Sequence, residues 1–211
     1  MNGESRMQAY YLLKTMNVLI ATQNQDKFRI VKGLLSDCGL SDCLFKNLND
    51  VGIESQSEEC GDLINRALMK ARHAYDAISE KGQIDIYVGV DDGMRYKNGK
   101  TDENSKEITG QILCHDLLDI GETIINVRAF VFLDKEGRVA DKFEIELPFK
   151  FIGNKNNIQL QAARYPLSHV LSSLKGEKSM AEMGEGESMD YYLLFSRERM
   201  GKAISKITGR S

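Results

Sequence analysis

The clearest pattern near the start of the chain is an apolar run that gives way to a helical repeat. The run "MNVLIA" at 16–21 has the apolar continuity of a buried strand. Apolar residues then recur at the spacing of one helix face: Phe28, Val31, Leu34 and Leu35. Gly39 follows as a stop signal. We predict a buried strand at 16–21, an amphipathic helix to about Asp37, and an extension at 1–15 before them.

The remaining pattern alternates between strands and helices. It predicts, in order, a strand and loop at 43–54, a long helix from 63 to near 82, a strand at 84–93, a helix at 101–120, an antiparallel hairpin at 123–151 turning at 134–137, a polar stretch at 153–164, and a last helix from about 190 to 207. The glycine-containing "MGEGES" before that helix is typical of a loop. This order indicates an α/β fold with a mixed sheet, in a single domain spanning 16–211.

Composition narrows the class of protein. The chain has 211 residues and a net charge of −3, so no strong basic field favours DNA or RNA as a partner. Its apolar runs are far shorter than a membrane span, and its N-terminus lacks a signal-peptide pattern. The four cysteines form no CxxC pair and have no histidine partner at zinc-like spacing. We expect a cytoplasmic protein that binds neither a membrane nor a nucleic acid polymer.

The polar hexapeptide "TQNQDK" lies where the first strand passes into the first helix. In α/β sheets this is where ligands bind, because helix N–H groups and the helix dipole attract anions. Thr22 and Asn24 can donate to phosphate oxygens, and Lys27 supplies a charge one turn into the helix. The alternative is that Thr22 or Asn24 only caps the helix and Lys27 is solvated, which the hexapeptide alone favours.

A pair of carboxylates, Asp91 and Asp92, ends the predicted strand at 84–93. Adjacent carboxylates repel each other unless a cation or hydrogen-bond donors satisfy them, which makes a site for a hard metal ion plausible. The alternative is a solvated turn opened by Asp92-Gly93. A phosphate-binding loop and a carboxylate pair at two strand ends of one sheet are what Mg²⁺-assisted phosphoryl chemistry requires.

Four segments of the chain, taken in order, resemble the inosine/xanthosine triphosphate pyrophosphatases. These enzymes hydrolyse deaminated purine nucleoside triphosphates to monophosphate and pyrophosphate. "VLIATQNQDKFRIVKGLL" is similar to the family's T-x-N-x-x-K loop and helix, and "ALMKARHAYDAI" to its A-L-x-K-A-R-x-A helix. "VGVDDGM" resembles its A-D-D-S-G-L segment, and "EKSMAEM" its K-T-x-A-E-M segment. The resemblance covers residues 16 to about 205.

The resemblance implies a role for each matching residue. Thr22, Asn24 and Lys27 would hold the triphosphate, and Lys70 would point at the phosphates from its helix, although it could also be a surface lysine. Asp92 would be both metal ligand and general base for the attacking water, with Asp91 beside it. The resemblance also implies Mg²⁺ as cofactor, an elongated sheet with two lobes around a nucleotide cleft, and a homodimer.

The chain departs from the family at several positions. The family has Glu-Asn before A-L-x-K, where the glutamate binds metal, but this chain has Asn65-Arg66. A carboxylate could instead come from the preceding turn, from Glu58, Glu59 or Asp62. The Ser after the paired aspartates and the lysine expected shortly after A-E-M are also missing.

The elements that bind the base in the family are poorly kept. The G-[FY]-D-P loop survives at most as Tyr165-Pro166. The S-H-R segment becomes "SRERMGKA", where Arg197 or Arg199 would stand in. The phosphate half of the site is therefore better preserved than the base half.

Three hypotheses remain open from the sequence. The first is a Mg²⁺-dependent nucleoside triphosphate pyrophosphatase with Asp92 activating water. The second is a nucleotide-binding or sensing protein that keeps the fold and the phosphate site but has lost turnover. The third is a related pyrophosphatase acting on a modified or pyrimidine nucleotide.

Overall fold

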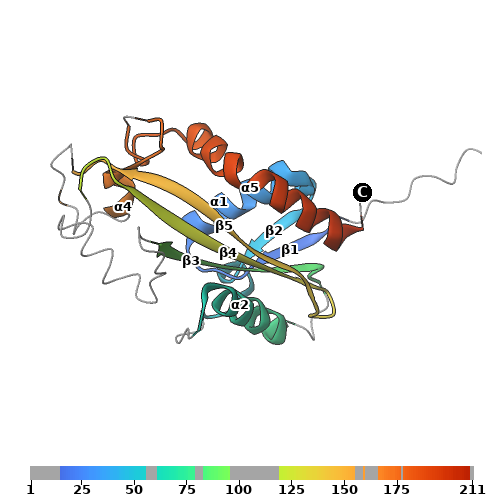
Figure 1. Cartoon of the computed structure of the whole chain (residues 1–211). Helices are drawn as coiled ribbons and strands as arrows, with labels where there is room; N and C mark the ends of the chain where they lie inside the picture. The colour runs from blue at the N-terminus through green and yellow to red at the C-terminus, as the bar shows by residue number, and fades with distance from the viewer. Residues whose placement is uncertain are drawn as a thin grey trace, which may run out of the picture.

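The computed structural model describes residues 15–55, 61–78, 83–95, 119–154, 159, 166–176 and 178–209. A six-stranded mixed sheet lies at the centre, with helices on both of its faces (Figure 1). The predicted fold class, α/β with a mixed central sheet and flanking helices, is confirmed.

The sheet has the strand order β2-β1-β3-β4-β5-β6. Its strands are β1 (Asn17–Ile20), β2 (Leu44–Asn47), β3 (Ile86–Arg95), β4 (Thr123–Asp134), β5 (Val139–Phe151) and β6 (Leu171–Ser172). The helices are α1 (Gln25–Leu35), α2 (Leu63–Ile78), α4 (Pro166–Val170) and α5 (Glu185–Thr208), with a π-helical turn at Ser36–Leu40 and a 3₁₀ turn at Asn49–Val51. β1 pairs in parallel with β2 and β3, and all other pairs are antiparallel.

The two faces of the sheet carry different helices. Successive side chains of a strand point to opposite faces. On β3, Tyr87 joins the core beneath α2, whereas Val88 and Val90 join the core beneath α1 and α5. Figure 1 shows α2 on one side of the sheet and α5 on the other. Any two adjacent residues of β3 therefore face different helices.

Gly89 allows α2 to approach β3 closely. A Cβ atom on this residue would lie 1.9 Å from the backbone oxygen of Ala67, which is far inside van der Waals contact. Three alanines on the same face of α2 are fully buried: Ala67, Ala71 and Ala74. Small side chains on both elements therefore bring Arg66 and Lys70 of α2 to the carboxylate of Asp91.

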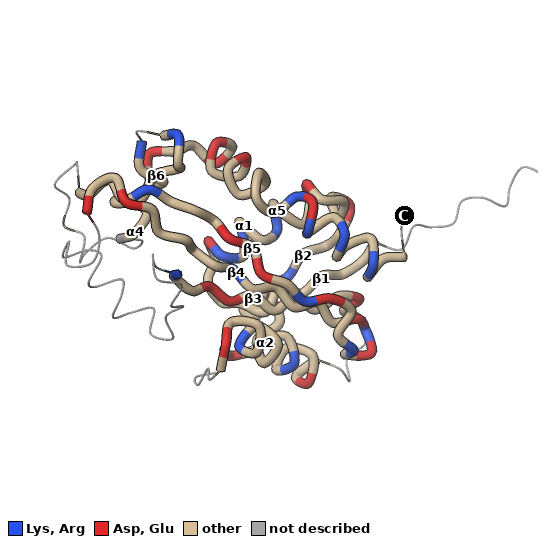
Figure 2. The backbone as a smooth tube through the Cα atoms, in the orientation of Figure 1, with Lys and Arg blue, Asp and Glu red and all other residues tan. Residues whose placement is uncertain are grey.

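Charges on α5 follow the helix dipole. Glu185 and Glu187 lie in its first turn and Lys206 in its last, which stabilises a helix. Figure 2 shows this acidic-to-basic order along α5.

Most predicted elements are confirmed. The first strand, the first helix, the strand at 43–54 and the long helix from Leu63 are present, and the hairpin turns at 134–137 as predicted. Gly39 has a φ of 119°, a conformation that favours glycine, where the first helical segment ends. Most of the predicted helix at 101–120, and the extension at 1–15 apart from its last residue, lie outside the described residues.

The position of the paired aspartates in their strand was predicted wrongly. Asp91 and Asp92 do not end the strand, because β3 continues to Arg95. They stay in the strand because β4 pairs with β3 along this whole stretch, with Asp91 opposite Ala129 and Asp92 opposite Arg128. The alternative of a solvated turn at Asp92-Gly93 is therefore also wrong.

The last helix begins at an earlier residue than predicted. α5 begins at Glu185, inside the "MGEGES" segment that we expected to be a loop. The Glu187 side chain accepts a hydrogen bond from the backbone N–H of Gly184 at 3.1 Å, which fixes the first turn. The two glycines hide this signal because glycine usually marks a loop.

None of the helices in the described ranges has the length and apolar character needed to cross a membrane.

Candidate functional site

The loop between β1 and α1 forms an N-cap. Asn24 Oδ1 accepts hydrogen bonds from the backbone N–H groups of Asp26 (3.0 Å) and Lys27 (3.1 Å). Thr22 Oγ1 accepts one from the N–H of Asn24 at 3.1 Å. The capping interpretation is confirmed for Asn24. The cap uses only the side-chain oxygen of Asn24 and does not involve its Nδ2 amide group. Phosphate binding by Asn24 stays a prediction.

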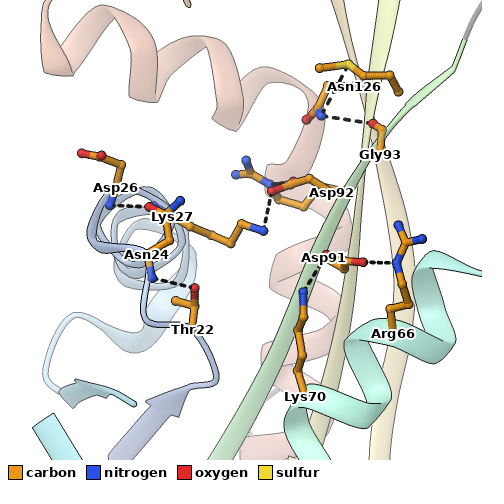
Figure 3. Close-up of polar contacts among 12 residues, drawn as sticks. Thr22, Asn24, Asp26, Lys27, Arg66, Lys70, Asp91, Asp92, Gly93 and Asn126 are labelled. Atoms are coloured by element: carbon orange, nitrogen blue, oxygen red, sulfur yellow. Dashed lines mark hydrogen bonds and ion pairs between the residues drawn. The ribbon is translucent and has the colours of Figure 1, made fainter. Parts of the chain in front are cut away.

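Asp91 and Asp92 lie just beyond the point where β1 ends. The register between β1 and β3 stops at Ile20 opposite Val88, while β3 continues. Adjacent strand residues face opposite sides, so the two carboxylates face different helices. Figure 3 shows Lys27 reaching Asp92 from α1, and Arg66 and Lys70 reaching Asp91 from α2.

Two cationic side chains bind Asp92. Lys27 Nζ lies 2.8 Å from Oδ2, and Arg128 Nε donates to Oδ1 at 2.5 Å. Burial by itself would raise the pKa of Asp92, but the charges and hydrogen bonds of Arg128 and Lys27 outweigh it and hold this pKa well below its usual range. Asp92 is therefore ionised throughout the neutral pH range.

Arg128 is a buried cation on β4 and is only 6% exposed. Burial alone would lower its pKa, but Asp92 and then Tyr192 raise it, so the guanidinium stays charged. The guanidinium carbon lies 5.4 Å from the centre of the Tyr192 ring, a cation–π contact. Its Nη1 is buried and has no hydrogen-bond partner among the described residues. Asp92, Arg128 and Tyr192 thus link β3, β4 and α5.

Asp91 is bound in the same way on the other face. Lys70 Nζ donates to Oδ1 at 2.7 Å, and Arg66 Nε donates to Oδ2. Both donors come from α2, where they lie one turn apart. Asp91 and Arg66 are 5% and 8% exposed, so this ion pair is buried.

A cavity of about 240 Å³ lies between the N-terminus of α1 and the middle of α2. It is lined by Ala21, Thr22, Gln23, Asn24, Lys27, Leu48, Ser55, Lys70 and His73. The two lysines reach this cavity from opposite faces of the sheet, and their side chains are each 18% exposed. All four residues that the sequence assigned to phosphate binding line this one cavity.

A second cavity, of about 610 Å³, lies beside Tyr192. Its lining includes apolar side chains from α1, α5 and the segment between β6 and α5: Ile30, Met180, Met183, Met189 and Tyr192. Asp26 also lines it, next to Lys27 of the smaller cavity. The two cavities therefore lie on either side of the first turn of α1.

Other residues predicted for the site lie elsewhere. Arg199 binds Asp141 (3.1 Å) and stacks over Phe143, about two helical turns, or about 10 Å, along α5 beyond Tyr192. Arg197 is near Arg199 on α5 and offers its backbone oxygen to Cys38. The structure brings neither arginine to the two aspartates or to either cavity's lining.

The remaining predicted positions are also accounted for. Tyr165, Glu58 and Glu59 lie outside the described residues. Asp62 accepts a hydrogen bond from the backbone N–H of Asn65 at 2.8 Å at the start of α2. That contact orders the first turn of α2.

The sequence did not single out Arg128, Tyr192 and His73. Arg128 had a usable signal, since it is the one charged residue in the apolar strand "TIINVRAFVFL", and a buried charge requires a partner. His73 follows Lys70 by one helical turn and lines the same cavity, with Nε2 2.9 Å from the backbone oxygen of Glu54. Nothing local marks Tyr192.

The residues present do not fit a Mg²⁺ ion shared by the two aspartates. Mg²⁺ prefers carboxylate and phosphate oxygens in octahedral geometry. Asp91 and Asp92 face opposite sides of β3, and each carboxylate oxygen already binds a lysine or an arginine. Within the described part of the chain, no three His, Cys, Asp or Glu residues gather in a metal-binding group. The donor chemistry of this site instead suits an anion.

Solved structures share this mixed α/β fold. One is a nucleoside-triphosphatase, a dITP/XTP pyrophosphatase, from Mycobacterium abscessus, with a TM-score of 0.51 and 19% identity over 85% of this chain and 92% of that one. Another is the Ham1 protein of Staphylococcus aureus, with a TM-score of 0.60 and 14% identity over 92% of this chain and all of the other. No protein-family model matches the sequence, and no curated protein does. At these identities the likeness establishes the fold.

Proposed function

We propose that the protein hydrolyses a nucleoside triphosphate to a nucleoside monophosphate and pyrophosphate. One observation carries the proposal. Lys27 and Lys70 converge from opposite faces of the sheet on a cavity at the N-terminus of α1, and each is bound to an aspartate of β3. Lysines and a helix N-terminus together bind phosphate groups, and a carboxylate beside them can position water. The fold that this chain shares with a dITP/XTP pyrophosphatase supports the same activity.

In this proposal the water oxygen attacks the α-phosphorus, and the bond from that phosphorus to the bridging oxygen breaks. Pyrophosphate leaves with the bridging oxygen, and the water proton passes to Asp92 and then to solvent. Lys27 and Lys70 offset the charge that develops on the leaving pyrophosphate. Asp92 suits the role of orienting water, because its low pKa keeps it ionised as a hydrogen-bond acceptor.

The nucleoside half is assigned to the larger cavity. Its methionines and Tyr192 offer apolar and aromatic surface on which a base can stack, and it lies across the first turn of α1 from the phosphate cavity. This assignment replaces Arg197 and Arg199, which contact neither cavity.

The test is a measurement of pyrophosphate release from a panel of nucleoside triphosphates, with and without Mg²⁺. We expect release of pyrophosphate and monophosphate in equal amounts from at least one triphosphate. Lys27→Ala should abolish release, whereas Lys202→Ala, which removes an exposed lysine of α5 paired with Glu198, should not. Release of inorganic phosphate with a diphosphate product would contradict the proposal.

A second candidate function is a nucleotide-binding or sensing protein without turnover. The observation in its favour is that all four oxygens of Asp91 and Asp92 bind cationic side chains, and that Arg128 and Lys27 hold the pKa of Asp92 below its usual range, which weakens Asp92 as a proton acceptor. Tight binding of a triphosphate with no pyrophosphate release from the whole panel would favour this candidate over hydrolysis.

A further inference from the structure

The two aspartates and their partners form one cluster with excess positive charge. Lys27 and Arg128 bind Asp92, and Lys70 and Arg66 bind Asp91. Four cations surround two carboxylates, so the cluster carries two more positive than negative charges. A polyphosphate anion entering the adjacent cavity therefore meets a positive potential before any metal ion is added.

Each aspartate has one partner in the cavity and one partner behind it. The lysines line the 240 Å³ cavity, and each side chain is 18% exposed. The arginines do not line it, and the Arg66 and Arg128 side chains are only 9% and 7% exposed. The same division occurs on both faces of β3, although Arg66 comes from a helix and Arg128 from a strand.

This division decides what happens to the aspartates when the lysines bind phosphate. A lysine side chain is flexible and can turn from a carboxylate to a phosphate oxygen in the same cavity. If the lysine were its only cation, each aspartate would then keep an uncompensated charge in a largely buried position, which is strongly unfavourable. Arg66 and Arg128 remain in place and keep both carboxylates compensated.

We propose that Arg66 and Arg128 take the place that a divalent cation would need at Asp91 and Asp92, so that the protein binds a triphosphate without a divalent metal ion. The inference rests on the proposed function in placing the phosphates beside Lys27 and Lys70. It goes beyond that function because arginines of this chain, and not a metal ion, would balance the negative charges of both aspartates. Arg66 and Arg128 are positioning residues, since they contact the aspartates and not the cavity.

The test uses inorganic triphosphate, which probes the phosphate site without any base. Its affinity for the full-length protein is measured by calorimetry in EDTA and again in excess Mg²⁺. We expect the dissociation constant in EDTA to be no more than about threefold that in Mg²⁺, because Mg²⁺ only lowers the charge of the ligand. Binding that requires Mg²⁺ would overturn the inference and leave the proposed function intact. No binding in either buffer would overturn both.

Two variants test the arginines directly. Arg66→Gln and Arg128→Gln should each weaken binding in EDTA by about tenfold or more, and Mg²⁺ should restore part of the loss, since the lysine must then stay on its aspartate. Arg128→Lys should retain most of the affinity in EDTA. A purely structural role would lower affinity equally in both buffers, and that result would overturn the assignment.

A matched control and a folding check complete the experiment. Arg138→Gln removes an arginine paired with Asp134 at the hairpin turn, away from the cluster, and should change neither affinity. Thermal unfolding identifies any variant that fails to fold. If Arg128→Gln fails to fold, the double change of Asp92→Asn with Arg128→Gln removes both charges of that pair together. In that protein the EDTA affinity should recover to within about threefold of wild type, because Lys27 no longer has a carboxylate to leave.

Discussion

Asp92 holds the central position among the individual residues of the site. It binds Lys27 from α1 and Arg128 from β4, and its side chain is still 23% exposed. Asp91, its neighbour in sequence, is more buried than Asp92 and binds Arg66 and Lys70. Two adjacent aspartates therefore have different environments, and the more exposed one is suited to meet water.

Replacing Asp92 by asparagine should abolish turnover and leave phosphate binding largely intact. The change removes the carboxylate that positions water, which typically contributes about 10²–10⁴-fold to the rate. Lys27, which would no longer be held by a charge, remains available to the phosphates. The measurements are kcat for pyrophosphate release and calorimetric affinity for inorganic triphosphate. Asp141→Asn, which affects an aspartate paired with Arg199, is the control. A wild-type kcat for Asp92→Asn would show that the assignment is wrong.

Replacing Asn24 separates its capping role from phosphate binding. Asn24→Ser keeps a cap oxygen and loses the amide donors, whereas Asn24→Ala loses both. We expect Asn24→Ala to lower the free energy of unfolding by about 1 kcal/mol, and Asn24→Ser to change it by only a few tenths. Both should weaken triphosphate binding more than monophosphate binding. Denaturant unfolding and calorimetry measure the two effects, and equal losses for both ligands would remove Asn24 from the phosphate site.

At the scale of elements, the site depends on how closely α2 lies on β3 and how far β3 extends beyond β1. The close approach at Gly89 brings Arg66 and Lys70 onto Asp91. Among the described strands, the part of β3 beyond β1 pairs with β4, so the geometry of Asp92 and Arg128 depends on the register between β3 and β4.

Adding a methyl group at Gly89 should separate α2 from β3. The new Cβ would lie 1.9 Å from the backbone oxygen of Ala67, and such overpacking typically costs about 1–3 kcal/mol or more. We expect Gly89→Ala to lower the free energy of unfolding by that amount and to weaken triphosphate binding through the displaced Lys70. In Gly186→Ala, the new Cβ on α5 meets no described residue within 4 Å beyond its chain neighbours and its own helix backbone, so this control should gain at most about 0.5–1 kcal/mol. Unchanged stability for Gly89→Ala would contradict the close approach.

The hairpin turn should make stability depend on pH through Asp134. Its side chain accepts hydrogen bonds from the N–H groups of Glu136 (3.0 Å) and Arg138 (2.9 Å). Partial burial alone would raise the pKa of Asp134, but these bonds and the Arg138 guanidinium outweigh it and lower the pKa. A lowered pKa in the folded state means that this stabilisation is complete above the unfolded value of about 4 and is lost as the pH falls below it.

Asp134→Ala should therefore cost about 1–2 kcal/mol at pH 7, and the difference from wild type should shrink below about pH 4. Urea unfolding from pH 7 to pH 3 measures this difference. Asp134→Asn keeps an acceptor oxygen but has no charge, so it should show a smaller loss with little dependence on pH. A difference that grows on acidification would have the wrong sign for this account.

At the scale of the whole molecule, one sheet brings together a phosphate cavity and a larger apolar cavity on either side of the first turn of α1. Both cavities have polar side chains in their lining, but the phosphate cavity presents two lysines, Lys27 and Lys70. The larger cavity has methionines and one tyrosine, and its charged residues Asp26, Arg29 and Glu185 form ion pairs, since Arg29 binds both carboxylates.

Weak discrimination between bases follows from that contrast. Large ratios of kcat/KM require buried polar groups that are left unpaired by the wrong base, and a stacking surface does not supply them. We expect kcat/KM for inosine and xanthosine triphosphates to exceed that for adenosine and guanosine triphosphates by less than about 10³-fold, or another base to be preferred. Kinetics across purine and pyrimidine triphosphates measure the ratios. A ratio above that limit would mean that a specific base-reading pocket exists.

The sequence alone determined the local features of this protein. Three elements could be predicted because each depends on a short-range repeat of apolar residues: the strand at 16–21, the helix after it and the hairpin at 123–151. The same repeat predicted that Thr22, Asn24 and Lys27 lie beside a helix N-terminus. The helical repeat predicted that Lys70 lies on a helix, and the resemblance to a family implied that it binds the same phosphates.

Only the tertiary structure decided how these parts meet. The pairing of β4 with β3 puts Arg128 opposite Asp92, and the packing of α5 brings Tyr192 to Arg128; both contacts join residues far apart in sequence. The same packing keeps Arg197 and Arg199 away from the site. Strand alternation then separates Asp91 from Asp92, although they are neighbours in the chain. Such contacts depend on sheet register and helix packing, which a one-dimensional pattern does not contain.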